Sequence, residues 1–343
     1  MKPYLSIVAA SRNDNHGGDL TSRMNLFLRG IYYQLDKYQI PGEVIIVEWN
    51  PPEDREPLSS VLPKPTSKWV NLRIVTVPAE IHSRYTVGKV LPLFQMIAKN
   101  VGIRRAKAPY ILCTNVDLLF SDKLIKFLSE RKLQKGTYYR CNRCDIPKEI
   151  DYSKDIPELL KYAKKHIIQR LGKNRLHPNY MGSSQLWYVN IFTHLLIILI
   201  AKIKRLLDSH SRTTIESADT WACGDFTLMH TDNWHQINGY FELDAYSIHI
   251  DSLGIFAALG QGIKQKILPA DHCTYHVSHQ AGWELQDPMK KIYFDINMPM
   301  LDWNTAQAAC EHMYLKKEVL PINDENWGLK NEQLHEEVFT YEQ

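Results

Sequence analysis

The chain lacks several features that would place it in a specialised class of protein. Cysteine is scarce, with 6 residues among 343, which is far below the density of a disulfide scaffold. The formal net charge is only +3, which is too small to indicate nucleic acid as a partner. The sequence contains no internal repeats and no low-complexity tract. The remaining composition, 44% hydrophobic and 23% charged, is that of an ordinary globular protein with one sizeable domain or two small ones.

Long hydrophobic runs are also missing. The most apolar segment, residues 186–203, is interrupted by Asn190 and His194 and does not predict a membrane span. Two interpretations stay open for it. The segment forms a helix buried in the protein or in a homodimer interface, or it forms a helix that lies on a membrane surface through residues 186–205.

The first ten residues mimic a signal peptide only faintly. Their apolar part is short and runs directly into Arg12-Asn13-Asp14, so a first strand explains it better. We therefore expect a cytoplasmic protein, which is peripherally associated with a membrane if residues 186–205 lie on one.

The first third of the chain predicts alternating strands and helices. Residues 4–10 and 43–48 are short apolar runs, typical of strands buried on both faces. The segment between them carries apolar residues at helical spacing and ends at Pro41-Gly42. A further strand is predicted over 70–77 and a helix over 90–106. This pattern predicts an α/β fold with a mostly parallel sheet flanked by helices.

The stretch from Tyr110 to Phe120 predicts another buried strand, which breaks at a polar segment. Side chains two residues apart on an extended segment point the same way, so Asn115 and Asp117 would project together. A carboxylate beside an amide suits a hard divalent cation that keeps phosphate or water as other ligands. Ligands of parallel sheets bind at the carboxyl ends of the strands, where Arg12–Asp14 and Glu48–Asn50 would also lie.

Asn115-Val116-Asp117 resembles the Asp-x-Asp motif of GT-A glycosyltransferases, with Asn in place of the first Asp. The preceding run, 98–112, is similar to the segment that leads into this motif in many members. Residues 220–242 are similar to the acceptor-side segment of galactosyltransferase-like members. The resemblance spans about 1–145 and 218–285. It implies one GT-A-like, Rossmann-like α/β domain over residues 1–310, with a helical insertion at 150–217 and a C-terminal extension at 311–343.

The function implied by the resemblance is transfer of a sugar from a nucleotide-sugar donor to a hydroxyl of a glycan or lipid-linked acceptor, as in polysaccharide biosynthesis. A UDP-sugar and an inverting reaction are favoured. Asp117, with His276 or His279 from the His-rich run 271–279, would hold Mn²⁺ or Mg²⁺ against the diphosphate. The donor contacts that the resemblance implies are Ser11, Arg12, Asn13, Glu48, Lys99, Asn100, Asn115 and Asp117.

On the acceptor side, the resemblance implies Asp251 as general base, because an inverting transferase needs a carboxylate within reach of the acceptor hydroxyl. A helix-capping role for Asp251 stays open, since an acidic residue stabilises any helix start. The rival carboxylates are Asp225, Glu242 and Asp244. The acceptor contacts implied by the resemblance are Asp225, Trp234 and Glu242.

Two other functions stay open. A sugar-nucleotide nucleotidyltransferase uses a similar sheet but needs a Gly-rich, basic loop after its first strand, and residues 11–19 hold two Gly and one Arg. A non-catalytic nucleotide- or sugar-binding protein with a decayed Asp-x-Asp site is favoured by Asn115.

Three further segments carry weaker signals. Cys141 and Cys144 form a lone C-x-x-C without a second pair, so ordinary thiols are favoured over zinc or redox chemistry. Arg143 and Asp145 predict either a structural ion pair or a substrate contact. The polar tail after about Glu325 is compatible with mobility.

Overall fold

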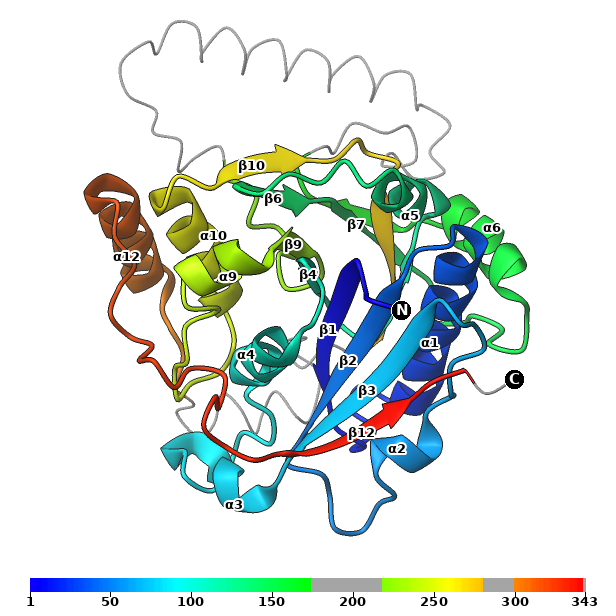
Figure 1. Cartoon of the computed structure of the whole chain (residues 1–343), viewed down its shortest axis with the longest axis horizontal. Coiled ribbons are helices and arrows are strands. Elements are labelled where there is room, and N and C mark those ends of the chain that lie inside the picture. The colour runs from blue at the N-terminus through cyan, green and yellow to red at the C-terminus, as the bar shows by residue number, and fades with distance from the viewer. Residues whose placement is uncertain (174–217, 280–298, 342–343) are drawn as a thin grey trace, which may run out of the picture.

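The computed structural model describes residues 1–173, 218–279 and 299–341. Its main sheet has eight strands in the order β10-β6-β9-β4-β1-β2-β3-β12 (Figure 1). The central strands β3, β2, β1 and β4 are parallel, as are β10 and β6, whereas β9 and β12 run antiparallel to their neighbours. The predicted α/β fold with a large, mostly parallel sheet flanked by helices is confirmed. These strands are β1 (Leu5–Ser11), β2 (Gly42–Trp49), β3 (Val70–Val77), β4 (Tyr110–Cys113), β6 (Thr137–Arg140), β9 (Thr227–His230), β10 (Lys264–Ile267) and β12 (His335–Phe339).

Both faces of the sheet are buried, and the central strands β1, β2 and β4 are mostly apolar along both faces. Along β1, Leu5 and Ile7 join the core that packs against α1 (Leu20–Lys37), while Val8 joins the core on the opposite face. Helix α4 (Gln95–Arg105) covers that second face. It approaches β1 closely at Gly102, where an added Cβ would lie 2.4 Å from a methyl carbon of Val8.

A second, four-stranded sheet has the order β5-β11-β7-β8. Its strands are β5 (Leu118–Phe120), β7 (Asn142–Ile146), β8 (Gln169–Leu171) and β11 (Cys273–Val277). The break predicted after Cys113 is where the chain leaves the main sheet at β4 and enters the small sheet at β5. The chain makes the same change of sheet between β6 and β7, which follow one another in sequence but belong to the main sheet and the small sheet respectively.

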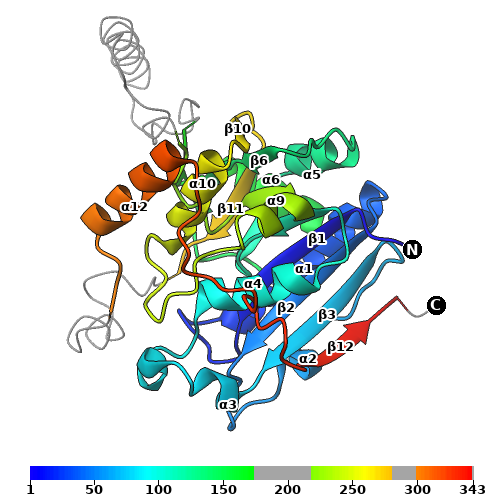
Figure 2. The same cartoon turned by 60° about the vertical axis from the view of Figure 1, so that its left-hand side comes forward.

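The remaining helices surround the two sheets (Figure 2). Helix α12 packs against α10, and α9 follows β9 directly. Their bounds are α2 (Leu58–Val61), α3 (Ala79–His82), the 3₁₀ helix η1 (Thr86–Lys89), α5 (Asp122–Ser129), α6 (Ile156–Lys165), α9 (Thr231–Gln236), α10 (Ile250–Gly260) and α12 (Trp303–Lys316). None of the described helices has the length and apolar character that spanning a bilayer requires.

The polar C-terminal tail is ordered against the main sheet. Its strand β12 pairs antiparallel with β3 and so closes that edge of the sheet. The pattern of charged residues hid this strand, because an edge strand that is partly exposed carries no apolar run. The expected boundary at residue 310 falls inside α12. Of the expected insertion at 150–217, the structure describes α6 and β8, and the segment 186–205 lies outside the described residues.

Candidate functional site

A cavity of about 260 Å³ lies at the carboxyl ends of β1 and β4, where the two sheets meet. Its polar wall comes from the loops after these strands, from β7 and from the end of β11. The predicted residues Ser11, Arg12, Asn115, Asp117, Asp225, His276 and His279 all line it. The other lining residues are Ala10, Asp14, His16, Leu20, Arg23, Leu91, Pro92, Leu93, Gln95, Val116, Arg143, Tyr246 and Ser247.

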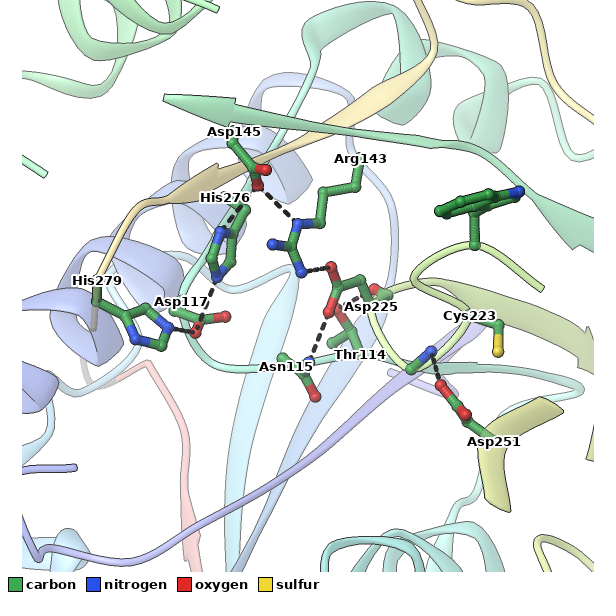
Figure 3. Close-up of polar contacts among 12 residues, drawn as sticks. Thr114, Asn115, Asp117, Arg143, Asp145, Cys223, Asp225, Asp251, His276 and His279 are labelled. Carbon is green, nitrogen blue, oxygen red and sulfur yellow. Dashed lines mark hydrogen bonds and ion pairs between the residues drawn. The ribbon is translucent and has the colours of Figure 1, made fainter. Parts of the chain in front are cut away.

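Asp117, His276 and His279 converge at this cavity, with one ligand atom from each within 4.8 Å of the others (Figure 3). Asp117 Oδ2 lies 2.9 Å from Nε2 of His279 and 3.5 Å from Nε2 of His276. Asp117 Oδ1 is buried and has no hydrogen-bond partner among the described residues. The antiparallel pairing of β5 with β11 causes this convergence, since it places His276 opposite Leu118.

The ring of His276 is held from its other side by Asp145. The parallel pairing of β7 with β11 sets these two residues side by side, and His276 Nδ1 lies 3.0 Å from Asp145 Oδ1. Burial lowers the pKa of His276, but the carboxylates of Asp117 and Asp145 outweigh it and raise that pKa to about 9. Burial also acts to raise the pKa of Asp117, yet the two imidazoles hold it well below its usual range.

Arg23 contributes a buried guanidinium that the sequence analysis missed. The residue is only 2% exposed, and its Nη1 lies 3.4 Å from Asp117 Oδ2. Its Nη2 donates to the backbone carbonyl oxygens of His16 and Gly18. The available signal was a cation three residues after Leu20 and four before Phe27, which puts it on the buried face of α1.

Asn115 connects the cavity to the interior by bonding through both ends of its amide. Its Oδ1 accepts from Gln95 Nε2 at 2.8 Å and from Lys99 Nζ at 2.9 Å. Its Nδ2 donates to Asp225 Oδ1 at 2.6 Å, and Asp225 Oδ2 accepts from Arg143 Nη1 at 3.2 Å (Figure 3). Arg143 also donates through Nε to Asp145 at 2.7 Å, so both open interpretations of this pair stand, an ion pair and a position at the cavity wall.

Four of the predicted donor contacts do not line the cavity. Lys99 is fully buried and donates to Asn115 and to the carbonyl of Gly224. Asn100 is bonded through its amide to the backbone of Tyr240. Asn13 donates to the carbonyl of Glu56, and Glu48 accepts from the backbone N–H of Leu58.

Three of the predicted acceptor-side residues also lie away from the cavity. Trp234 is buried and donates to the carbonyl of Ile111, and Glu242 accepts from Asn100 and the N–H of Gly328. Asp251 lies in the first turn of α10, and its two oxygens accept from the backbone N–H groups of Gly224 and Ser252. Figure 3 shows it apart from the Asp117 cluster. The fourth such residue, Asp225, stands at the cavity wall.

The two ends of the C-x-x-C run are buried thiols. Burial raises the pKa of Cys141 well above its usual value. Within residues 1–173, 218–279 and 299–341, the cluster of metal-ligating side chains includes neither Cys141 nor Cys144.

The donor set of Asp117, His276 and His279 fits a divalent transition metal. Imidazole ligands favour transition metals such as Fe²⁺ or Zn²⁺ over Mg²⁺, which prefers oxygen ligands. The buried Oδ1 of Asp117 offers a second carboxylate oxygen to the same ion. Asp145 holds Nδ1 of His276, which leaves Nε2 facing Asp117, and such carboxylate–imidazole pairs are common behind metal ligands.

Comparisons with known proteins give a remote likeness. No protein-family model matches the chain, and no curated protein matches it. Among solved structures, a fragment of TarS from S. aureus in complex with UDP-GlcNAc is similar at TM-score 0.42 and 11% identity, covering 92% of this chain and 72% of that one. The same fragment in a second structure is similar at TM-score 0.41 and 12% identity, covering 92% of this chain and 71% of that one. A longer TarS chain is similar at TM-score 0.38 and 12% identity, covering 92% of this chain and 43% of that one. Because these TM-scores are low, the function is inferred from the residues of the site.

Proposed function

We propose that this protein is a glycosyltransferase that takes a nucleotide-sugar donor and a divalent cation. The observation that carries the proposal is the convergence of Asp117, His276 and His279 at a cavity that lies at the carboxyl ends of parallel strands. Parallel α/β sheets bind nucleotides at this edge. The Asp-x-Asp-like segment at 115–117 supplies the carboxylate, and it does so next to two imidazoles that lie far from it in the sequence.

Mn²⁺ is the cation of this proposal, because it binds the oxygens of a carboxylate and a diphosphate and also accepts imidazole ligands. Two imidazoles and one carboxylate favour a transition metal, and a bound cation of this kind neutralises negative charge on a diphosphate leaving group. The donor is a UDP-sugar under this proposal, and the acceptor is a hydroxyl of a glycan or a lipid-linked sugar. Under this proposal Ser11 and Arg12, which line the same cavity, would contact the nucleoside.

For an inverting reaction, Asp225 is better placed than Asp251 to act as general base. Asp225 lines the cavity, whereas Asp251 does not line it and accepts from the backbone N–H groups of Gly224 and Ser252. Asp225 would accept the proton of the acceptor hydroxyl as the acceptor oxygen bonds to the sugar C1. The bond from C1 to the diphosphate oxygen breaks at the same time, and its electron pair leaves with the diphosphate. Asp251 would then hold the Gly224 turn beside Asp225.

Calorimetric titration of UDP and GDP, each with and without Mn²⁺, tests the proposal. We expect binding of UDP that requires Mn²⁺ and that is lost in Asp117→Ala. The matched control is Asp122→Ala, which removes an exposed carboxylate five residues along the chain. Binding that ignores both the metal and Asp117 would remove these residues from their roles, and a folded protein that binds neither nucleotide would contradict the proposal.

Turnover separates the remaining alternatives. Release of UDP from a panel of UDP-sugars, abolished in Asp225→Asn and only weakened in Asp251→Asn, is expected for the transferase. Metal-dependent UDP binding with no UDP release from any donor would instead favour a non-catalytic binding protein. Formation of a sugar nucleotide from UTP and a sugar phosphate would favour a nucleotidyltransferase.

A further inference from the structure

Arg23 places a fixed positive charge in the wall of the proposed cation site. Its Nη2 is anchored by the carbonyl oxygens of His16 and Gly18, the latter at 2.9 Å, so the guanidinium cannot swing away without breaking these bonds. Its Nη1 lies 3.4 Å from Asp117 Oδ2. Its Nε is buried and has no acceptor among the described residues. A buried guanidinium with an unpaired N–H at a cavity wall indicates a place for an anion.

The oxygen that Arg23 contacts is the same one that the two imidazoles face. Asp117 Oδ2 lies 2.9 Å from Nε2 of His279 and 3.5 Å from Nε2 of His276. A dication bound to this oxygen would lie next to the guanidinium, and the single charge of Asp117 is already balanced by Arg23. Asp145 and Asp225 share the one guanidinium of Arg143, so these three groups carry a single net negative charge, which offsets only part of the charge of a dication. Positive charges this close repel strongly where water is largely excluded.

We infer that Arg23 makes cation binding depend on a diphosphate, so that the metal binds tightly only together with the anion. The inference rests on the proposed function, since it deepens the role of the same site. A diphosphate brings negative charge that offsets both the dication and the guanidinium. Its oxygens also match the N–H groups of an arginine, which binds phosphate through charge-assisted hydrogen bonds. The two ligands therefore bind with positive coupling, and each raises the affinity for the other by the same factor.

Anchoring of the loop before α1 is the competing role for Arg23. The residues Asn15, Gly17, Gly18 and Asp19 all have left-handed backbone conformations, and Arg23 bonds to two carbonyls of this loop. If anchoring were the only role, loss of Arg23 would loosen the loop and weaken the binding of every ligand. Coupling predicts the opposite effect on the cation alone. Loss of Arg23 would strengthen its binding, because removing the fixed charge removes the repulsion.

The test measures the dissociation constant of Mn²⁺ by calorimetry, alone and at saturating UDP, in the wild type and in three variants. In the wild type, UDP is expected to lower the dissociation constant of Mn²⁺ about tenfold or more. Uridine, which lacks the phosphates, is expected to leave this constant unchanged. Arg23→Gln is expected to bind Mn²⁺ alone about tenfold more tightly than the wild type, with the gain from UDP reduced to under about threefold. Arg23→Lys keeps the charge and should stay near the wild type.

Arg29→Gln is the matched control, since Arg29 lies on the same helix and also donates to two backbone carbonyls, those of Tyr152 and Lys154. It should leave all Mn²⁺ and UDP constants unchanged. Mn²⁺ that binds Arg23→Gln no more tightly than the wild type would overturn the inference. The inference would also be overturned if uridine raised the wild-type affinity for Mn²⁺ as much as UDP does, or if neither UDP nor pyrophosphate raised it. Neither of these results requires a variant to fold.

Inorganic pyrophosphate separates this inference from the proposed function. If pyrophosphate tightens Mn²⁺ binding through Arg23 but UDP does not, the coupling stands and the UDP-sugar proposal fails. If UDP binds with Mn²⁺ but the affinity for Mn²⁺ alone does not respond to Arg23→Gln, the proposed function stands and the coupling fails.

Discussion

Two buried ion clusters in this protein differ in how completely their atoms are paired. Near the amino ends of the central strands, the guanidinium of Arg73 donates to Glu43 and Glu336, with its Nη1 2.7 Å from Glu43 and its Nε 2.7 Å from Glu336. Glu43 accepts further bonds from Ser6 Oγ and the N–H of Lys107. At the carboxyl ends, by contrast, the cluster around Asp117 leaves Asp117 Oδ1 and Arg23 Nε without partners in the described part of the chain.

The difference separates a structural role from a binding role. Buried charges are tolerated when every donor and acceptor is satisfied, as in the Arg73 cluster, which ties β12 to β3 and β2. The Asp117 cluster has both an unpaired acceptor and an unpaired donor at a cavity, which is the arrangement expected where a cation and an anion bind. Substitutions in the first cluster should therefore change stability alone, and substitutions in the second should change ligand binding.

The largest effect is expected at Arg73. Arg73→Met would leave Glu43 buried without its cation, and the free energy of unfolding is expected to fall by about 3–5 kcal/mol. Urea unfolding followed by circular dichroism measures this change. Under conditions where the variant is folded, its affinities for Mn²⁺ and UDP should equal those of the wild type. A loss of ligand affinity by the folded variant would erase the distinction between the two clusters.

The next effect concerns Asn115, whose amide accepts from Gln95 and Lys99 and donates to Asp225. Asn115→Asp would set a second carboxylate against Asp225, where the amide now donates at 2.6 Å. We expect a loss of about 2 kcal/mol in the free energy of unfolding, because a buried hydrogen bond becomes a repulsion between like charges. The same urea unfolding assay measures it.

The exchanged double variant Asn115→Asp with Asp225→Asn provides the control. It keeps the bonds from Gln95 and Lys99 to residue 115, and that from Arg143 to residue 225, and it only reverses the donor between the two positions. We expect it to recover at least half of the lost stability. Equal destabilisation of the single and double variants would show that the bond between residues 115 and 225 does not account for the loss of stability.

A smaller effect follows from the raised pKa of His276. Because this pKa rises from 6.5 to about 9 on folding, protonated His276 contributes stability that is fully present below pH 6.5 and is lost as the pH rises through 9. In the presence of a chelator, the free energy of unfolding should therefore fall by roughly 2 kcal/mol between pH 7 and pH 9. Mn²⁺ affinity should rise over the same interval, since the metal competes with the proton for the imidazole. His276→Gln should show neither trend, and an unchanged pH dependence in that variant would place the titrating group elsewhere.

The sequence predicted the parallel core of the fold because strands buried on both faces read as continuous apolar runs. The pattern around 4–10, 43–48, 70–77 and 110–113 corresponds to β1, β2, β3 and β4. The partition of 110–120 between two sheets left no such signal, since both halves are apolar and only the pairing of β5 with β11 reveals the second sheet. Strand β12 was hidden for a related reason, because its sequence is partly charged and one of these charged residues, Glu336, pairs with Arg73 inside the protein.

The candidate site was predictable only in part. Asp117, His276 and His279 were found from a motif and from the density of histidine, and the structure brings them together at one cavity. The link from Asp145 to His276 spans 131 residues and depends on the register of β7 with β11, which no local pattern specifies. Lys99 and Asn100 resemble donor contacts in sequence, but the helix α4 is buried almost all round, so both side chains bond inside the protein.

Pulsed electron paramagnetic resonance of bound Mn²⁺ tests the central claim most directly, because it detects nitrogen ligands of the ion. With UDP present, the account predicts modulation from two imidazole nitrogens in the wild type, from one in His276→Gln and in His279→Gln, and no bound Mn²⁺ in Asp117→Ala. Bound Mn²⁺ that shows no nitrogen modulation in the wild type, or wild-type modulation that persists in both histidine variants, would contradict a cation site formed by Asp117, His276 and His279.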